Sequence, residues 1–181
     1  MTYHQRHLPH WQPEGAALFV TWRLYGSLPK HVLVPQTEVT SGRAFLEFDR
    51  LLDSAVSGPM WLRDREIADI MVDALRYGEN ELRLYRLDAF VVMSNHVHVL
   101  MEPNAELSKI TRAIKGYSAR KANLVLGRTG QPFWQDESFD RWVRNQDELN
   151  RTIRYIEKNP VSAGLTSKIE EYRWSSAFQA A

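Results

Sequence analysis

Two histidines separated by one residue, His96 and His98, are the side chains in this sequence best suited to bind a divalent metal ion. They lie in residues 90–101, whose many valines favour a β-strand over a helix. Side chains two residues apart share one face of a strand, so both imidazoles point the same way. Two imidazoles on a rigid strand form half of a metal site. Because the pattern is short, two ordinary half-buried histidines are the alternative interpretation.

A tyrosine follows these histidines on a predicted amphipathic helix, residues 108–126. Its apolar positions recur at helical spacing: Leu107, Ile110, Ile114, Tyr117 and Leu124. The pattern predicts that Tyr117 faces the sheet and that Lys121, one turn later, shares its stripe. A buried ammonium group needs an anion, and a phosphate would serve. Alternatively, Lys121 extends past the helix end to solvent and Tyr117 is a core residue.

These residue types together suit chemistry on a phosphodiester. A tyrosine hydroxyl can attack phosphorus and form a covalent phosphotyrosine. A metal ion on His96 and His98 would polarise the phosphate and offset its developing charge. The charge of the chain also divides: residues 47–102 hold eleven acids and six bases, whereas residues 107–158 hold eleven bases and six acids. A polyanion that binds one face fits this asymmetry, although a solvated helix face would show it too.

Composition limits the remaining classes. The chain has 181 residues, 44% hydrophobic content and no cysteine, which indicates one folded domain without disulfides or thiolate sites. No apolar run is long enough for a membrane span, and the polar N-terminus does not resemble a signal peptide. We therefore expect a cytoplasmic protein that does not bind membranes.

The predicted elements alternate between strand and helix. We expect strands over residues 16–25, 83–93 and 96–102, the last two as an antiparallel hairpin. Helices are predicted over residues 41–54, 65–78, 108–126 and from Asp147 to a stop before Asn159-Pro160. Residues 1–13 are expected to form an arm, and residues 133–140 show no clear period. This order indicates a single α+β domain, an antiparallel sheet with helices packed on one face.

Several segments, in order, resemble REP-associated tyrosine transposases, a branch of the single-tyrosine (HUH) transposases. They are residues 19–24, 93–100, 117–123, 130–135, 154–165 and 174–176. The resemblance implies a ferredoxin-like fold with a C-terminal helical extension over residues 147–181. It also implies a nicking and rejoining enzyme that acts on single-stranded hairpin DNA with REP-like palindromes. Such enzymes form a 5′-phosphotyrosine with Mg²⁺ or Mn²⁺, as monomers or homodimers.

Carried over to this chain, the resemblance makes Tyr117 the nucleophile and His96 and His98 the metal ligands. A glutamine often stands one turn after the tyrosine as a third ligand, but here that position is Lys121, so the third ligand is not identified. The predicted DNA contacts are Arg112, Lys115, Arg120, Lys121 and Trp134. Basic residues would bind phosphates, and Trp134, like Trp11 and Trp142, would stack on bases unless it is a core residue.

Other functions fit less well. A domesticated hairpin-DNA-binding protein without catalytic activity is the main alternative, and the intact His96, His98 and Tyr117 argue against it. An RNA-binding ferredoxin-like module would show exposed aromatics on the histidine strand, and it shows none. A histidine-triad hydrolase needs a third histidine where Leu100 stands, and a zinc deaminase needs cysteine ligands.

Overall fold

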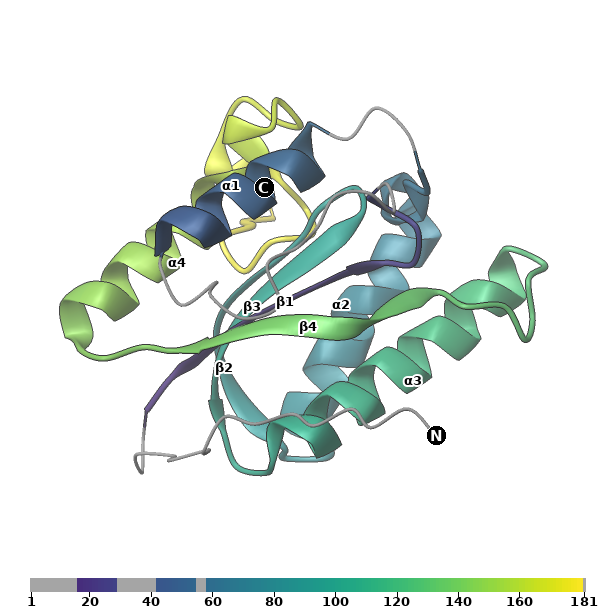
Figure 1. Ribbon diagram of the computed structural model, residues 1–181, viewed down its shortest axis with the longest axis horizontal. Helices are drawn as coiled ribbons and strands as arrows, with labels where there is room; N and C mark the ends of the chain where they lie inside the picture. The colour runs from purple at the N-terminus through teal and green to yellow at the C-terminus, as the bar shows by residue number, and fades with distance from the viewer. Residues whose placement is uncertain (1–15, 29–41, 55–57, 181) are drawn as a thin grey trace.

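The computed structural model describes residues 16–28, 42–54 and 58–180, so the predicted N-terminal arm and Trp11 lie outside the described residues. Four antiparallel strands form one sheet in the order β2-β3-β1-β4. The strands are β1 (Leu18–Leu24), β2 (Tyr85–Val92), β3 (His96–Pro103) and β4 (Trp134–Trp142). Figure 1 shows the strands with the helices around them.

The helices are α1 (Gly42–Asp53), α2 (Arg65–Asn80), α3 (Leu107–Val125) and α4 (Gln146–Ser162), with short 3₁₀ turns η1 (Trp61–Arg63) and η2 (Ile169–Glu171). The order β1-α2-β2-β3-α3-β4 is the ferredoxin-like arrangement, with α1 inserted after β1 and α4 added after β4. This confirms the predicted α+β class and its ferredoxin-like sheet. None of the helices in the described ranges has the length and apolar run that a bilayer crossing requires.

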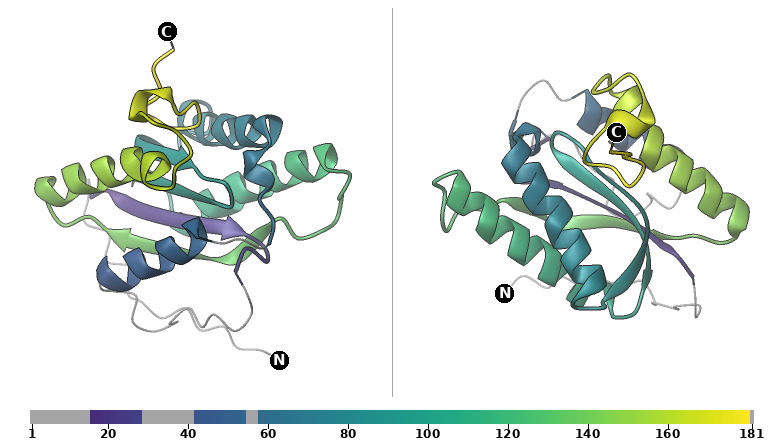
Figure 2. Two further views of the ribbon diagram at one scale, coloured as in Figure 1. Left: turned by 90° about the horizontal axis from the view of Figure 1, so that it is seen from above. Right: turned by 180° about the vertical axis from the view of Figure 1, so that it is seen from behind.

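Helices cover both faces of the sheet, so the prediction that they pack on one face holds only for α2 and α3. Leu18, Val20 and Trp22 of β1 point into a core shared with these two helices. Phe19 points the other way, into a second core with Phe45 of α1 and with α4. The view from behind in Figure 2 shows α2 and α3 lying across the sheet. Both crossovers, β1-α2-β2 and β3-α3-β4, put their helices on one face because such connections are right-handed, whereas α4 follows the edge strand β4 and returns on the other.

The buried stripe of α3 differs from the predicted one. Its buried positions step by four residues from Ile110 to Ile114, Ser118 and Ala122, whereas Leu124 is 70% exposed and Lys121 is also exposed. The prediction that Lys121 lies on the inward face is therefore wrong. The small residues Ser118 and Ala122 let α3 approach the sheet. Four residues make slightly more than one helical turn, so a buried stripe with this spacing winds slowly around the helix and leaves Tyr117 and Lys121 to one side of it.

Helix α2 begins at Arg65, as predicted, and Asp64 caps it: the Asp64 carboxylate accepts a hydrogen bond from the Glu66 amide at 2.9 Å. It does not stop at Gly78, as the sequence suggested, but continues to Asn80. Gly78 serves a close approach instead: a Cβ there would lie 2.3 Å from the hydroxyl of Tyr85 on β2. That hydroxyl donates to the Leu75 carbonyl at 2.7 Å, so α2 is tied closely to the sheet.

The C-terminal third of the chain supplies two elements that sequence patterns described poorly. Residues without a clear period form the edge strand β4, which alternates weakly because much of it is exposed. Helix α4 continues through Pro160 to Ser162 instead of stopping before Asn159. A proline near a helix end removes only one intrahelical hydrogen bond, so the last turn survives. Asn159 therefore lies on the same helix as Tyr155, one turn later.

Candidate functional site

His96 and His98 point to the same side of β3, as predicted. Their Nε2 atoms lie 3.1 Å apart, and the two side chains are 1% and 0% exposed. They face the second core, on the α1 and α4 side of the sheet, where His98 stacks on Phe19. The pair thus lies beneath α1, shielded from solvent.

Each imidazole is oriented through its other nitrogen. His96 Nδ1 lies 2.7 Å from Asn95 Oδ1, an oxygen that can only accept, so Nδ1 carries the proton. His98 Nδ1 lies 2.7 Å from Thr21 Oγ1 on β1. Asn95 is itself held because its amide donates to the Leu52 carbonyl at 3.0 Å. Such partners fix the ring orientation and leave the Nε2 lone pairs directed at a common point.

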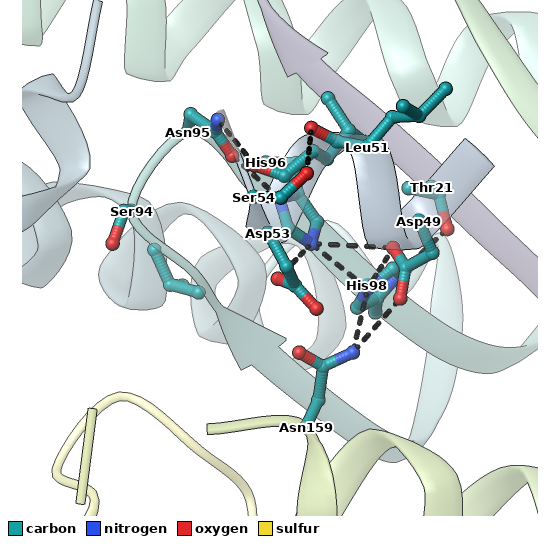
Figure 3. Close-up of polar contacts among 12 residues, drawn as sticks. Thr21, Asp49, Leu51, Asp53, Ser54, Ser94, Asn95, His96, His98 and Asn159 are labelled. Carbon is teal, nitrogen blue, oxygen red and sulfur yellow. Dashed lines mark hydrogen bonds and ion pairs between the residues drawn. The ribbon is translucent and has the colours of Figure 1, made fainter. Parts of the chain in front are cut away.

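A buried carboxylate completes the group. Asp49 of α1 places Oδ1 3.0 Å from His98 Nε2 and 3.4 Å from His96 Nε2 (Figure 3). Neighbouring ligands of an octahedral ion with bonds of about 2.1 Å lie roughly 3 Å apart, so the three donor atoms have suitable spacing. Among the described residues these three are the cluster that could hold a metal ion. Two imidazoles and one carboxylate are a donor set that divalent cations bind, and they would leave other coordination positions for substrate.

Helix α4 adds a tyrosine and an amide to this cluster. The Tyr155 hydroxyl donates to Asp49 Oδ2, and its ring centroid lies 5.8 Å from that of His98. The Asn159 amide nitrogen lies 3.1 Å from Asp49 Oδ2 and 3.3 Å from His98 Nε2. Tyr155 and Asn159 are four residues apart, so both point from one face of α4.

Two buried oxygens in the cluster make no hydrogen bond within the described residues: Asp49 Oδ1 and Asn159 Oδ1. Unsatisfied buried acceptors are costly, and oxygen ligands next to two imidazoles are what a divalent cation binds. The residues present therefore fit a metal ion, with Asp49 and the two histidines as ligands and Asn159 as a possible fourth after an amide rotation. We conclude that a divalent metal can bind here.

Burial shapes the protonation of the cluster. Burial, and then the adjacent His98, lowers the pKa of His96 to about 3, so this ring is neutral and able to ligate. Burial, and then the Asp49 charge, raises the pKa of Asp53 to about 7. Asp53 Oδ1 lies 3.9 Å from His96 Nε2, at the border of the cluster.

Tyr155 and Asp49 are shifted in opposite directions. Burial alone would raise the pKa of Asp49, but His98, His96 and the Tyr155 hydrogen bond lower it more, so this carboxyl stays ionised. Burial, and then the Asp49 charge, raises the pKa of Tyr155 well above its usual value. The phenol is therefore protonated in this arrangement, with its hydrogen directed at a carboxylate.

Comparison with known proteins assigns the family. The sequence profile described as "Transposase IS200 like" matches residues 66–159, more than half of the chain. The chain belongs to the IS200-like transposases. The match includes both histidines, Tyr155 and Asn159, whereas Asp49 precedes it. No curated protein sequence matches the chain.

Two solved structures resemble this transposase. A REP-associated tyrosine transposase bound to a REP hairpin is 17% identical, with a TM-score of 0.53 over 97% of this chain and 82% of the other. This likeness shows a common fold. A protein from Deinococcus radiodurans R1 described as a transposase is 16% identical, with a TM-score of 0.44 over 88% of this chain and 98% of the other.

The transposase does not bring Tyr117 to the histidines, so the prediction that these three groups meet is wrong. Tyr117 packs on the α2 side of the sheet, where its ring stacks on Tyr77 with centroids 6.1 Å apart. The histidines lie on the opposite face, with α1 and α4. The β-sheet stands between them, and the tyrosine beside the imidazoles is Tyr155.

Of the five predicted DNA contacts, Lys115 and Trp134 form hydrogen bonds within the protein instead. Trp134 is 6% exposed and its Nε1 donates to Ser118 Oγ at 2.9 Å, so it is a core residue rather than a stacking surface. The Lys115 ammonium donates to the Gln135 and Asp136 carbonyls at 2.6 and 3.0 Å, which ties α3 to β4. The other three, Arg112, Arg120 and Lys121, are exposed on α3.

Sequence reasoning missed Asp49, Tyr155 and Asn159. Tyr155 and Asn159 could have been found from the sequence, because residues four apart share one face of a helix. The helix was predicted to end before Asn159, however, so the two residues were not placed on one face. Asp49 carried no signal: it is one acid in an amphipathic segment far from the histidines in sequence.

Proposed function

We propose that this transposase cuts and rejoins single-stranded DNA with Tyr155, rather than Tyr117, as the nucleophile. The supporting observation is that the Tyr155 hydroxyl, the Asp49 carboxylate and both imidazoles meet around one point. That point combines an attacking oxygen with donors for a cation, which is what strand cleavage at a phosphodiester requires.

The residues divide the work as follows. His96, His98 and Asp49 would hold a divalent ion, Mg²⁺ or Mn²⁺, and this ion would supply the polarisation of the phosphodiester. The Tyr155 oxygen bonds to phosphorus and the bond from phosphorus to O3′ breaks. The tyrosine loses one proton and O3′ gains one, so a 5′-phosphotyrosine and a free 3′-hydroxyl result. Attack by a 3′-hydroxyl on this linkage reverses the step and rejoins strands.

The proposed substrate is single-stranded DNA beside a hairpin. The related solved structure holds a REP hairpin, and the family membership supports a DNA partner. Arg112, Arg120 and Lys121, exposed on α3, would bind backbone phosphates on the face opposite the metal centre. We expect this binding to orient the hairpin while the single strand reaches Tyr155.

Covalent capture tests the proposal. Wild-type protein with Mn²⁺ and a 3′-labelled hairpin oligonucleotide should yield a labelled protein band on denaturing electrophoresis. Tyr155→Phe should abolish the band, because it lacks the attacking oxygen, whereas the matched variant Tyr117→Phe should retain it. An adduct that survives Tyr155→Phe and is lost in Tyr117→Phe would reverse the assignment. Hairpin binding without any adduct in the wild type would favour a catalytically silent DNA-binding protein.

A further inference from the structure

Arg23 of β1 is a cation on the face of the sheet that carries His96, His98 and Asp49. Thr21, two residues earlier, places Oγ1 2.7 Å from His98 Nδ1, so the side chains at positions 21 and 23 project to this same face. In the register of β1 and β3, Thr21 is paired with His98 and Arg23 is paired with His96. Strand β1 therefore places a hydroxyl beside one imidazole and a guanidinium beside the other.

Arg23 and His96 form a close pair of residues. The Leu24 amide donates to the Asn95 carbonyl at 2.8 Å, so the adjacent pair of the ladder, Arg23 with His96, is a non-hydrogen-bonded pair. Side chains approach most closely in such pairs, where the Cβ atoms are about 5 Å apart. An arginine side chain is longer than an imidazole, and its planar fork of donors suits a phosphate. The guanidinium can therefore reach a phosphate that is held at the histidines.

The edge strand β4 is irregular opposite Arg23. Trp22 is paired with Ser138 and Leu24 is paired with Trp134, so three residues of β4 lie where β1 has only Arg23. Bulges of this kind are frequent beside active sites, where they redirect a side chain or interrupt the pairing. A phosphate that approaches past β4 would therefore meet Arg23 before His96.

The burial of the Arg23 guanidinium is only partly compensated within the protein. The side chain is half-buried, and among the described residues its hydrogen-bond partner is the Ser27 hydroxyl, at a long 3.3 Å from Nη1. Burial lowers the pKa of Arg23, and the charge of Glu137 on β4 opposes this effect without cancelling it. A guanidinium carries five N–H donors. Two hydrogen bonds to a phosphate would supply the compensation that one serine does not.

We propose that Arg23 binds the scissile phosphate, or the phosphate directly beside it, and offsets its negative charge during cleavage. The inference rests on the proposed cleavage by Tyr155. As the Tyr155 oxygen bonds to phosphorus, negative charge is spread over the oxygens of the phosphoryl group, and a positioned arginine stabilises that charge. Arg23 is then a catalytic residue that β1 supplies, in addition to the residues of β3, α1 and α4.

Binding to modified DNA tests this contact without catalysis. A set of hairpin oligonucleotides carries one uncharged methylphosphonate linkage each, at successive positions of the single strand. In the Tyr155→Phe background, Arg23→Gln should weaken binding of the unmodified DNA about tenfold, as expected for a lost charged hydrogen bond. At one linkage the methylphosphonate should remove this difference, because the guanidinium then has no charge to bind. Fluorescence anisotropy measures each affinity, and this linkage should lie at, or directly beside, the one that the wild type cuts.

Further variants separate a phosphate contact from a role in folding. Arg23→Lys keeps the positive charge and should retain the linkage-specific effect in a smaller form. Arg86→Gln removes an arginine of β2 that is paired with Glu102, and it should leave every affinity unchanged. Isothermal titration calorimetry should show no loss of Mn²⁺ affinity in Arg23→Gln, because the guanidinium is not a metal ligand. Such a loss would mean that Arg23 only supports the cluster, and it would overturn the proposal.

The outcomes distinguish this proposal from the proposed cleavage. If the linkage-specific effect is found but the wild type forms no adduct with any oligonucleotide, cleavage by Tyr155 is wrong and the phosphate contact stands. If adducts form through Tyr155 but Arg23→Gln weakens binding equally at every linkage, Arg23 contributes only general positive charge and the assignment is wrong. An effect confined to a linkage farther from the cut would contradict it as well.

Discussion

At the scale of single residues, Asp49 connects the two halves of the proposed chemistry. One carboxylate oxygen faces both imidazoles and the other accepts from the Tyr155 hydroxyl and the Asn159 amide. A carboxylate that is 3% exposed is costly unless charge and hydrogen bonds compensate for its burial. Asp49 therefore couples the position of Tyr155, the proposed nucleophile, to the proposed metal site.

Replacement of Asp49 should separate its charge from its shape. Asp49→Asn preserves the size of the side chain but removes its negative charge. We expect the affinity for Mn²⁺ to fall by roughly tenfold or more, because loss of a residue that merely orients a metal ligand already lowers metal affinity by about that factor. Isothermal titration calorimetry measures it. Asp53→Asn, farther from the imidazoles, should lose less. Equal losses would show that Asp49 contributes only general negative charge.

Asp53 and His96 give folding opposite pH dependences. With the pKa of His96 lowered from 6.5 to about 3, only the unfolded chain binds a proton there between these values, so stability is lost as pH falls. With the pKa of Asp53 raised from 3.8 to about 7, only the folded chain holds its proton in that window, so stability is lost as pH rises. Between pH 3.8 and 6.5 the two effects oppose each other.

Replacing Asp53 should reveal the pH dependence of stability that His96 contributes. For protein in a metal chelator, we expect the wild-type free energy of unfolding to vary little across that window. Asp53→Asn should become more stable with rising pH, by up to about 1.4 kcal/mol per pH unit. Urea unfolding at several pH values measures this. Asp73→Asn, an exposed carboxyl on α2, should follow the wild type, and a flat profile for Asp53→Asn would contradict the assignment.

At the scale of elements, α1 covers the cluster of His96, His98 and Asp49. It supplies Asp49 and covers the imidazoles with Phe45, whose ring lies 4.6 Å from that of Phe139, 5.9 Å from that of Tyr155 and 6.0 Å from that of His98. Because the imidazoles are fully buried, the proposed cleavage requires α1 to shift before a phosphodiester can reach them. The insertion after β1 therefore covers the imidazoles and also supplies Asp49, the proposed third metal ligand.

Weakening this cover should expose the histidines. Phe45→Ala removes a ring that is 6% exposed, and we expect the free energy of unfolding to fall by about 3 kcal/mol. Modification of His96 and His98 by diethyl pyrocarbonate, followed by peptide mass spectrometry, should become faster. Leu51→Ala, at a 45% exposed position on the same helix, should change stability by less than about 0.5 kcal/mol and leave the modification rate unaltered. Similar rates in both variants would mean that α1 does not control access.

At the scale of the whole molecule, the cations of α3 and the metal centre lie on opposite faces of the sheet. If a hairpin binds along α3, as proposed, its single strand has to pass around a sheet edge to reach Tyr155. The β2 edge is covered by the C-terminal tail, since the Val92 amide donates to the Trp174 carbonyl and the Ser176 amide donates to the Phe90 carbonyl. Among the described residues, the path past β4 is therefore the more open one.

Salt dependence measures how many phosphates α3 contacts. Replacing Arg112, Arg120 and Lys121 by glutamine should lower the slope of log K against log salt by about 2, because each single-strand phosphate contact contributes about 0.7. Fluorescence anisotropy of a labelled oligonucleotide at several KCl concentrations gives the slope. Lys168→Gln, whose charge is paired with Glu171, should change it little. An unchanged slope in the triple variant would move the DNA interface elsewhere.

Local patterns predicted most elements and the histidine pair correctly. Strand and helix periods are properties of a few consecutive residues, so β2, β3, α1 and α3 were found within a few positions of their bounds. The pattern failed at β4, an exposed edge strand without alternation, and at the end of α4, where packing preserved a turn around Pro160. Both failures lie in the segment that carries the missed site residues Tyr155 and Asn159.

The sequence by itself determined that this is an α+β chain with two imidazoles on one strand face, because that relation involves neighbours two residues apart. Only the tertiary structure decided which tyrosine meets them. The choice depends on the face of the sheet that each helix covers: the right-handed crossovers place α3 and Tyr117 on one side, and the return from β4 places α4 and Tyr155 on the other. No local period carries that information, because it arises from how strands far apart in sequence are ordered in the sheet.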